Sequence, residues 1–166
     1  MYNYIINLGG SVPMKIAIGS DHAGYVLKAH LLEHLQDNGI DVDDFGGQSP
    51  EKIDYPVAGE RVADAVATGG YDKGILVCGT GVGMSITANK VPGIRAVVCS
   101  EPYSARMSRE HNDANILCLG ERVLGAGLAV EILDAWLSAQ FEGGRHASRV
   151  AIITEVEQKH VKSGNL

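Results

Sequence analysis

The sequence contains few cysteines and no long run of apolar residues, and each of these absences excludes a class of protein. Cys78, Cys99 and Cys118 make an odd number without the spacing of a metal-binding motif, so a disulfide framework is excluded. Free thiols are typical of a reducing compartment, and we therefore expect a cytoplasmic protein. The apolar runs are also far shorter than the roughly 20 residues that span a bilayer.

Positive charge is scarce as well. The 166 residues include 14 Lys and Arg against 20 Asp and Glu, which gives a formal net charge of −6. A nucleic acid or an anionic membrane would favour a basic surface, so we expect neither as a partner. A small anionic ligand is compatible with this balance, because it needs only a local cluster of positive groups.

The first thirteen residues differ from the rest of the chain. They lack the basic start and the long apolar segment of a signal peptide. We expect residues 1–13 to be a disordered leader or an extension outside the native protein. Regular patterning begins at Met14, and we expect a single domain over residues 14–162, since a chain of this length can bury a core of its own.

Short apolar runs alternate with helical periodicity along this domain. Strands are expected at residues 15–19, 40–45, 74–78, 94–99 and 115–120, and the acidic alternation of the second one indicates an edge strand. Helices are expected between them, with Ser100 capping the helix after the fourth strand. Parallel neighbours require helical connections, so we expect an α/β fold, a single Rossmann-like, doubly wound, five-stranded parallel sheet. An extra C-terminal helix, from residue 145 to about 162, has no strand partner and could wrap onto another subunit.

The glycine-rich segment from Cys78 to Gly83 is the most informative of the predicted strand ends. Ligands of open α/β sheets bind beyond the carboxyl ends of the strands, near a switch in strand order. Alternating glycines allow backbone N–H groups to point into one concavity, which stabilises an anion such as an enediolate. A thiol beside the start of a helix is suited to act as a thiolate base, although a buried, inert cysteine is an equally good interpretation.

Three better-known loops fit this segment poorly. A P-loop would require Gly-Lys-Ser or Gly-Lys-Thr where this chain has Gly83-Met84-Ser85. A phosphatase loop would require an arginine at position 84. A dinucleotide-binding fingerprint would require a third glycine there, and it stays a weak match because Glu101 lies at a tolerable distance for the ribose-binding acid.

Two histidine-containing pairs could take part in acid–base chemistry. Asp21-His22 could supply a carboxylate that shuttles protons and an imidazole that contacts a phosphate, or Asp21 could simply cap a helix. His111-Asn112 could be an acid–base group with its neighbour, or only polar residues between a helix and a strand.

Three arginines are candidates for an anion site. Arg145 and Arg149 lie four residues apart on one helical face and could bind a phosphate between them. They could equally form a solvated basic face beside nearby glutamates. Arg122, after the fifth strand, has the same ambiguity.

Six segments together indicate a family. They occur in the following order along the chain: Gly19-Ser20-Asp21-His22-Ala23-Gly24, Asp54-Tyr55-Pro56, residues 78–83, residues 93–105 (GIRAVVCSEPYSA), residues 109–115 (REHNDAN) and residues 142–149 (EGGRHASR). In this combination the chain from Met14 to about Gln158 resembles the type B ribose-5-phosphate isomerases, within the wider group that includes the galactose-6-phosphate isomerases.

The resemblance implies a role for each matching residue. Cys78 would be the base that removes the proton from C2 of the open-chain sugar, and Thr80 would help to hold the enediolate oxygens. Asp21 would shuttle a proton at the sugar oxygens, while His111 would open the furanose ring. The substrate-binding residues would be Gly79, Gly81, Val82 and Gly83 through their backbone, Tyr55 in the pocket wall, Asn112 for orientation, and His22, Arg122, Arg145 and Arg149 at the phosphate.

The resemblance also implies a homodimer or a higher oligomer whose active sites use residues of both chains, with Asn112 coming from the partner. It implies the interconversion of D-ribose 5-phosphate and D-ribulose 5-phosphate without a cofactor. A metal is not expected either, since no clustered His/Asp/Glu ligand set is evident in the sequence. Three alternatives stay open: an isomerase of a six-carbon sugar 6-phosphate such as allose or galactose 6-phosphate, a nucleotide- or flavin-binding module, and a non-enzymatic sugar-phosphate sensor.

Overall fold

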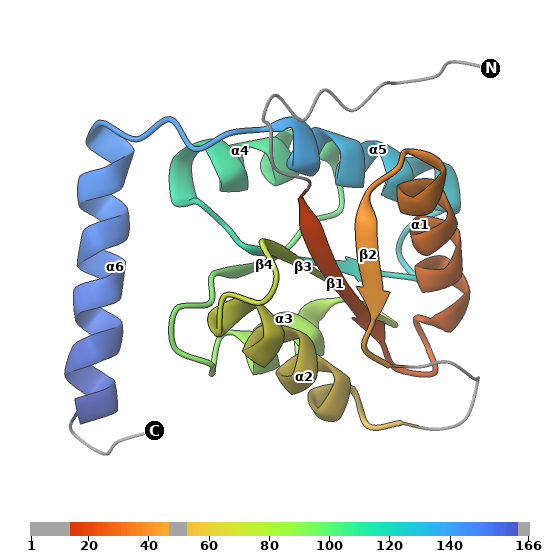
Figure 1. Cartoon of the computed structure of the whole chain (residues 1–166), viewed down its shortest axis with the longest axis horizontal. Helices are drawn as coiled ribbons and strands as arrows, with labels where there is room; N and C mark the ends of the chain where they lie inside the picture. The colour runs from red at the N-terminus through yellow and green to blue at the C-terminus, as the bar shows by residue number, and fades with distance from the viewer. Residues whose placement is uncertain (1–13, 47–52, 163–166) are drawn as a thin grey trace.

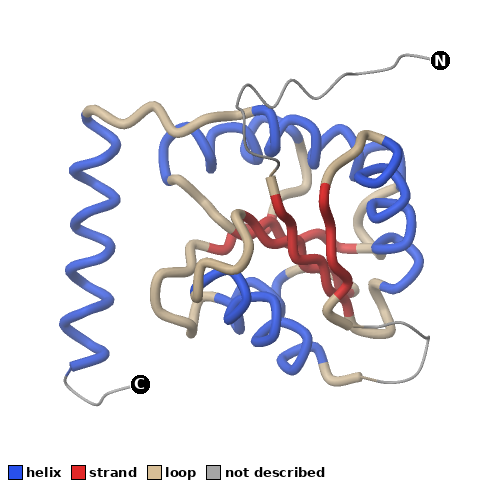
Figure 2. Tube along the Cα trace, viewed as in Figure 1, coloured by secondary structure: helices blue, strands red, loops and turns tan. Residues whose placement is uncertain are grey.

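The structure, a computed structural model, describes residues 14–46 and 53–162, so the predicted leader lies outside the described residues. One sheet of five parallel strands runs through its centre in the order β2-β1-β3-β5-β4 (Figure 2). The strands are β1 (Lys15–Ser20), β2 (Asp41–Asp44), β3 (Lys73–Cys78), β4 (Ala96–Val98) and β5 (Ile116–Gly120). The helices are α1 (Tyr25–Asp37), α2 (Tyr55–Ala67), α3 (Val82–Ala88), α4 (Pro102–Asn112), α5 (Ala126–Ser138) and α6 (Arg145–Lys162). The predicted α/β fold class is confirmed.

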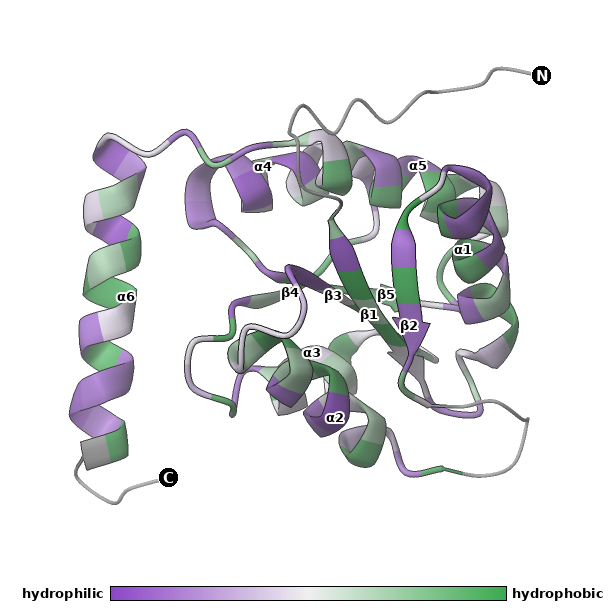
Figure 3. Cartoon of the chain, viewed as in Figure 1, coloured by the Kyte–Doolittle hydropathy of each residue, from purple (hydrophilic) through white to green (hydrophobic). Residues whose placement is uncertain are grey.

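Helices cover both faces of the sheet. Helices α1, α4 and α5 lie on one face, and α2 and α3 lie on the other (Figure 1). Successive strand residues point to opposite faces, so Ile75 and Val77 of β3 join the core under α1 and α5, while Leu76 and Cys78 join the core under α2 and α3. The strands therefore carry hydrophobic residues at successive positions rather than at every second one, as Figure 3 shows along β1 and β3.

The burial of each strand follows its place in the sheet. β3 lies at the centre between β1 and β5, and all six of its residues are buried. β2 lies at an edge and alternates exposed with half-buried residues, which confirms the edge position predicted from its acidic alternation. The sheet is thus a rigid platform whose central strand ends at Cys78.

Two predicted details at β4 and α4 are wrong. β4 covers only Ala96–Val98, a shorter stretch than residues 94–99, because it pairs with β5 alone at the other edge of the sheet. The cap of α4 is Glu101 rather than Ser100. The Glu101 carboxylate accepts from the backbone N–H groups of Tyr103 at 2.6 Å and Ser104 at 2.8 Å, and hydrogen bonds from Ser104 and Tyr103 hold the pKa of this carboxyl below its ordinary value. A carboxylate with two oxygens satisfies two amides at once, which a single hydroxyl does not.

Helix α6 stands beside the body of the molecule rather than on the sheet (Figure 1). Its neighbour in the fold is α4. Several apolar side chains of α6 are exposed, among them Ile152, Ile153 and Val156. Within the described ranges, no helix has both the length and the apolar character that crossing a membrane requires.

Candidate active site

Asp21 and Cys78 lie together where the strand order reverses. The chain passes from β1 to β2 on one side and then crosses to β3 on the other, so the crevice between β1 and β3 is the switch point of this sheet. Asp21 follows β1 directly, and Cys78 is the last residue of β3. The backbone N–H of Asp21 donates to the carbonyl oxygen of Val77 at 3.3 Å, which ties the two strand ends together.

The turn after β1 can approach β3 only because residue 24 is glycine. A Cβ atom at Gly24 would lie 2.4 Å from the carbonyl oxygen of Val77 and 2.8 Å from the backbone nitrogen of Cys78, both far inside contact distance. Gly24 is also the N-cap residue of α1, and it provides no side-chain cap. The helix-capping interpretation of Asp21 is therefore wrong: its Oδ1 accepts from the Ala23 N–H at 2.9 Å, inside the turn.

The side chain that caps α1 belongs instead to a residue far away along the chain, directly after β5. Oε2 of Glu121, directly after β5, accepts from the N–H of Leu27 at 2.8 Å in the first turn of α1. The N–H of Glu121 in turn donates to the carbonyl oxygen of Cys78 at 2.9 Å. This residue was not predicted from the sequence, because its two partners are far away along the chain, and it fixes the carboxyl ends of β3 and β5 to the start of α1.

The sulfur of Cys78 is enclosed by its own glycine loop. Cys78 is 6 % exposed, and its Sγ accepts a hydrogen bond from the Gly81 N–H at 3.1 Å. Gly81 adopts the left-handed conformation, with φ +78°, and α3 begins at the next residue. The first acceptor that the amides of this loop contact is thus the sulfur of Cys78 itself.

The other two cysteines have surroundings of the opposite kind. Burial, with a small contribution from Glu101, raises the pKa of the Cys99 thiol to about 11. Burial also raises the pKa of Cys118 well above its ordinary value. Both thiols stay protonated and belong to the core, as predicted.

Two further predicted residues, Tyr55 and Arg122, contact the loop, and Thr80 lies within it. The ring of Tyr55 packs on Gly83, where a Cβ atom would lie 2.8 Å from Tyr55 Cε2. The side chain of Arg122 passes over Gly79, with its Cδ, Nε and Cζ 3.5–3.7 Å from an added Cβ. The backbone of Thr80 packs just as closely on Gly120. The carboxyl edge of the sheet, where the strands end, therefore contains Asp21, His22, Tyr55, the 78–83 loop and Arg122.

The remaining predicted residues lie at the amino edge of the sheet, where the strands begin. Helix α4 returns antiparallel to the strands, so His111 and Asn112 in its last turn lie near the amino end of β5. Arg145 and Arg149 begin α6, which packs against α4. The length of β5, five residues at about 3.3 Å each, separates this group from Cys78 by roughly 16 Å. One chain alone does not bring the two groups together.

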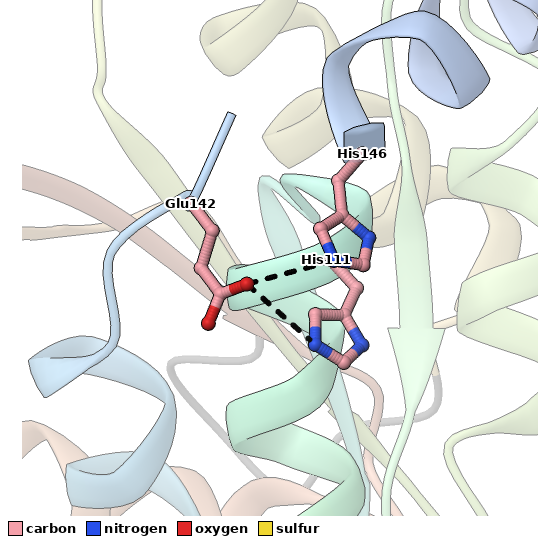
Figure 4. Close-up of side chains that lie close together, drawn as sticks. All are labelled: His111, Glu142 and His146. Carbon is pink, nitrogen blue, oxygen red and sulfur yellow. Dashed lines mark ion pairs between the residues drawn. The ribbon is translucent and has the colours of Figure 1, made fainter. Parts of the chain in front are cut away.

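At this second edge His111 stacks on a histidine that the sequence did not single out. The rings of His111 and His146 are parallel within 1°, with their centres 4.1 Å apart. Oε2 of Glu142 lies 4.0 Å from Nε2 of His111 and 3.5 Å from Nε2 of His146 (Figure 4). The signal for His146 was its place between Arg145 and Arg149 in the EGGRHASR segment, where helical spacing alone favours the arginines.

His146 is buried and kept neutral. It is 4 % exposed, and the Nε–H group of Arg145 donates to its Nε2 at 3.2 Å. Burial, reinforced by the neighbouring His111 and Arg145, holds the pKa of His146 below its ordinary value, whereas Glu142 opposes this shift. A neutral ring stacked flat on His111 fixes the orientation of that imidazole.

The side chains of His111, Glu142 and His146 form a possible metal-ligand set that the sequence did not reveal. Their ligand atoms lie within 4.8 Å of one another. Their geometry is nevertheless poor for a cation. Parallel rings direct the nitrogen lone pairs along parallel lines rather than to one point, and Nε2 of His146 already accepts from a guanidinium. With Arg145 and Arg149 adjacent, the surroundings favour an anion.

The sequence and the fold of this chain are similar to those of known proteins. The sequence model of the family described as Ribose/Galactose Isomerase matches residues 16–153 of the chain. The chain belongs to this family. Among curated members of the Ribose/Galactose Isomerase family, the chain is 59 % identical to "Ribose-5-phosphate isomerase B" of Escherichia coli, over 87 % of this chain and 97 % of the relative.

Two further similarities show the range of the family. The solved structure of ribose-5-phosphate isomerase B from Clostridium thermocellum superposes with a TM-score of 0.87 at 60 % identity, covering 89 % of this chain and 99 % of that one. A curated relative from Pectobacterium atrosepticum, named "D-erythrulose-4-phosphate isomerase", is 44 % identical over 89 % of this chain and 99 % of its own length. Members this similar thus carry names for sugar phosphates of different length.

Proposed function

We propose that this protein interconverts D-ribose 5-phosphate and D-ribulose 5-phosphate through an enediolate, with Cys78 as the base. The observation that carries the proposal is the sulfur of Cys78 at the switch point, held by the Gly81 amide and next to the turn of Asp21. The two relatives of about 60 % identity, both named ribose-5-phosphate isomerase B, support the pentose phosphate as substrate.

The proposed reaction moves one proton between neighbouring carbons. The Cys78 thiolate takes the proton from C2 of the open-chain aldose; the electron pair of that bond forms a C1–C2 double bond, and the π pair of the carbonyl moves onto the C1 oxygen. Thr80 and the backbone amides of Gly79, Val82 and Gly83 would face the oxygens on which the charge develops, while the Gly81 amide, also predicted to bind substrate, donates to the sulfur of Cys78. Asp21 moves a proton from the C2 hydroxyl to the C1 oxygen, and Cys78 returns its proton to C1. Protons and electrons balance in this scheme without a cofactor.

The proposal includes a second copy of the chain. His22 and Arg122, both exposed at the carboxyl edge, would meet the sugar phosphate from one chain. His111, Asn112, Arg145 and Arg149 would reach the same substrate from the partner, where His111 opens the ring and the two arginines bind the phosphate. The separation of these groups within one chain supports a homodimer with shared active sites.

Exposed apolar surface also supports this dimer. A groove of about 490 Å³ lies between α6 and the body, lined on the helix by Ile153, Val156 and Val161. Ile152 on the same helix is 58 % exposed and Val98 on the edge strand β4 is 44 % exposed. Burying such a surface against a second copy would stabilise the pair by about 25 cal/mol for each Å² removed from water.

The surroundings proposed for the protein follow from its charge and its thiols. The net charge of −6 argues against nucleic acid and anionic membrane as partners. Cys78, Cys99 and Cys118 are all free thiols, which fits a reducing cytoplasm.

A coupled assay of sugar phosphates side by side tests the proposal. The purified protein would be given ribose 5-phosphate, allose 6-phosphate, galactose 6-phosphate and a four-carbon aldose 4-phosphate, and kcat/KM would be compared. We expect the highest value for ribose 5-phosphate, with no added cofactor. A higher value for a tetrose or hexose phosphate would reassign the substrate. No turnover of any of them would reject the isomerase.

A further inference from the structure

A small cavity lies at the amino-terminal edge of the sheet, away from the proposed catalytic pocket. Lys73 lines it as the first residue of β3, whereas Cys78 ends the same strand at the other edge. Arg109 of α4, Met14 and residues 137–141 complete the wall. The cavity has a volume of about 130 Å³.

Both cations in this wall are buried and short of acceptors. Lys73 and Arg109 are each 8 % exposed. Within the described part of the chain, Lys73 Nζ makes no hydrogen bond, and its close contact is the ring of Trp136 at 5.5 Å. The guanidinium of Arg109 lies 5.7 Å from the same ring.

Arg109 uses only one of its three nitrogens. Nη1 donates to Oδ1 of Asp113 at 2.8 Å and to the carbonyl oxygen of Ala114 at 2.6 Å. Nε is fully buried and has no acceptor in the part of the chain that the structure covers. A buried donor without an acceptor costs free energy, so this site is incomplete as it stands.

The neighbouring carboxylates do not supply the missing hydrogen-bond acceptors. Asp113 is already paired with Arg95 and Arg109, and Oδ2 of Asp72 accepts from the backbone N–H of Lys15 at 2.7 Å. Burial and the charge of Arg109 lower the pKa of Lys73 to about 8, although Asp113 and Asp72 oppose this shift. The positive charges of Lys73, Arg109 and Arg95 around the cavity therefore exceed the negative charges of Asp113 and Asp72.

We propose that this cavity binds a small inorganic oxyanion of the phosphate class, held between Lys73 Nζ and Nη2 of Arg109, the guanidinium nitrogen that is neither enclosed like Nε nor bonded like Nη1. Oxyanions accept hydrogen bonds on every oxygen, which matches a wall that offers two cationic donors. The volume corresponds to about four water molecules, so an ion of phosphate size fits and a sugar phosphate does not. None of the residues proposed for catalysis lines it.

Ion binding here would act on the end of α4. Arg109 lies in the same last turn as His111, and through Asp113 and Ala114 it holds the residues that lead into β5. A bound oxyanion would tie this turn to the start of β3. We expect added stability, and no requirement for the ion in isomerisation.

The direct test measures the reactivity of the Lys73 amine. The folded protein would be acetylated with an N-hydroxysuccinimide ester at rising inorganic phosphate, and acetylation of each lysine would be followed by mass spectrometry. Bound phosphate covers Lys73 and favours its protonated form, so we expect about ten-fold protection when phosphate is about ten times its dissociation constant. The exposed Lys90 and Lys159 are internal controls and should react at unchanged rates. Equal rates for Lys73 with and without phosphate would overturn the proposal.

Variants separate this site from the catalytic one. Phosphate should raise the unfolding temperature of Arg122→Ala, which lacks a proposed catalytic phosphate ligand, and of Lys73→Arg, which keeps the positive charge. The variant that combines Arg122→Ala with Lys73→Met should lose most of that rise. A rise that survives Lys73→Met in this background, or one that Arg122→Ala alone abolishes, would contradict the site whether or not the protein is an isomerase.

Discussion

Cys78 differs from the other cysteines in what its sulfur contacts. Its Sγ accepts from the Gly81 amide at 3.1 Å, whereas burial raises the pKa of both Cys99 and Cys118. The three cysteines thus have different surroundings, and the contact that distinguishes Cys78 is one backbone N–H. The loop that follows Cys78 supplies it.

Replacing Cys78 by alanine should lower kcat by about 10²- to 10⁴-fold, because a general base acts in the transition state. The affinity for ribose 5-phosphate, measured by calorimetry, should change little. Cys99→Ala is the matched control, since it removes a buried thiol just beyond β4, which β5 separates from β3, and it should keep its kcat. A Cys78→Ala protein with unchanged kcat would reject the assigned base.

His146 should make stability depend on pH. Its pKa is lowered in the folded protein, so between that value and about 6.5 the unfolded chain binds more protons than the folded one. Its contribution is therefore fully present above about pH 6.5 and is lost as the pH falls through the lowered value. Urea unfolding of the wild type should show this loss.

His146→Phe keeps a flat ring against His111 without a titrating nitrogen, so its unfolding midpoint should fall less on acidification. His30→Gln, at an exposed site on α1, is the control and should keep the wild-type pH dependence. An identical pH dependence in His146→Phe and the wild type would show that His146 is not the responsible group.

At the scale of the elements, close backbone approaches shape the carboxyl edge of the sheet, where the strands end. The turn after β1 lies on the end of β3 at Gly24, and the end of β5 lies on the 78–83 loop at Gly120. The sequence predicted the strands and helices from their periodicity. It did not predict that Glu101 caps α4 or that Glu121 caps α1, because a cap is chosen by geometry among several polar residues near a helix start.

Replacing Gly24 by alanine should destabilise the protein by about 1–3 kcal/mol, since its Cβ would meet the backbone of Val77 and Cys78. It should also lower kcat, because the turn that carries Asp21 must move away from Cys78. Gly127→Ala, in the first turn of α5 where an added Cβ meets nothing within 4 Å, should instead stabilise by up to about 1 kcal/mol. Urea unfolding measures both, and equal effects of the two variants would contradict the close approach at Gly24.

At the scale of the whole molecule, the proposed active site is divided between two edges of the sheet. The carboxyl edge carries Cys78 and Asp21, and the amino edge carries His111 with the arginines of α6. A two-fold dimer can bring opposite edges of two chains together and forms two equivalent sites.

Mixing two inactive variants should restore activity if sites are shared. Cys78→Ala and the double variant Arg145→Ala, Arg149→Ala would each have little activity alone. After subunit exchange at equal amounts, half of the dimers are mixed and each has one intact site of two, so about a quarter of the wild-type activity should return. Native mass spectrometry would follow the exchange, since the two variants differ in mass, and light scattering would give the oligomeric state. Absence of recovery in mixed dimers, or a monomer in solution, would contradict shared sites.

Local patterning was sufficient for much of this protein. Apolar runs and glycine positions predicted the five parallel strands, and the edge character of β2 followed from its acidic alternation. The 78–83 loop was predicted to be the centre of the chemistry. These features depend on neighbouring residues and on periodicity, which a single sequence carries.

Only the tertiary structure decided which distant residues meet. It put Arg122 over Gly79, stacked His146 on His111, and left Lys73 and Arg109 as buried cations around one cavity. The spacing of these residues along the chain carries no sign of such contacts, because packing of whole helices against the sheet determines them. The identities of the candidate residues were therefore readable in advance, while their division between two edges was a property of the folded chain.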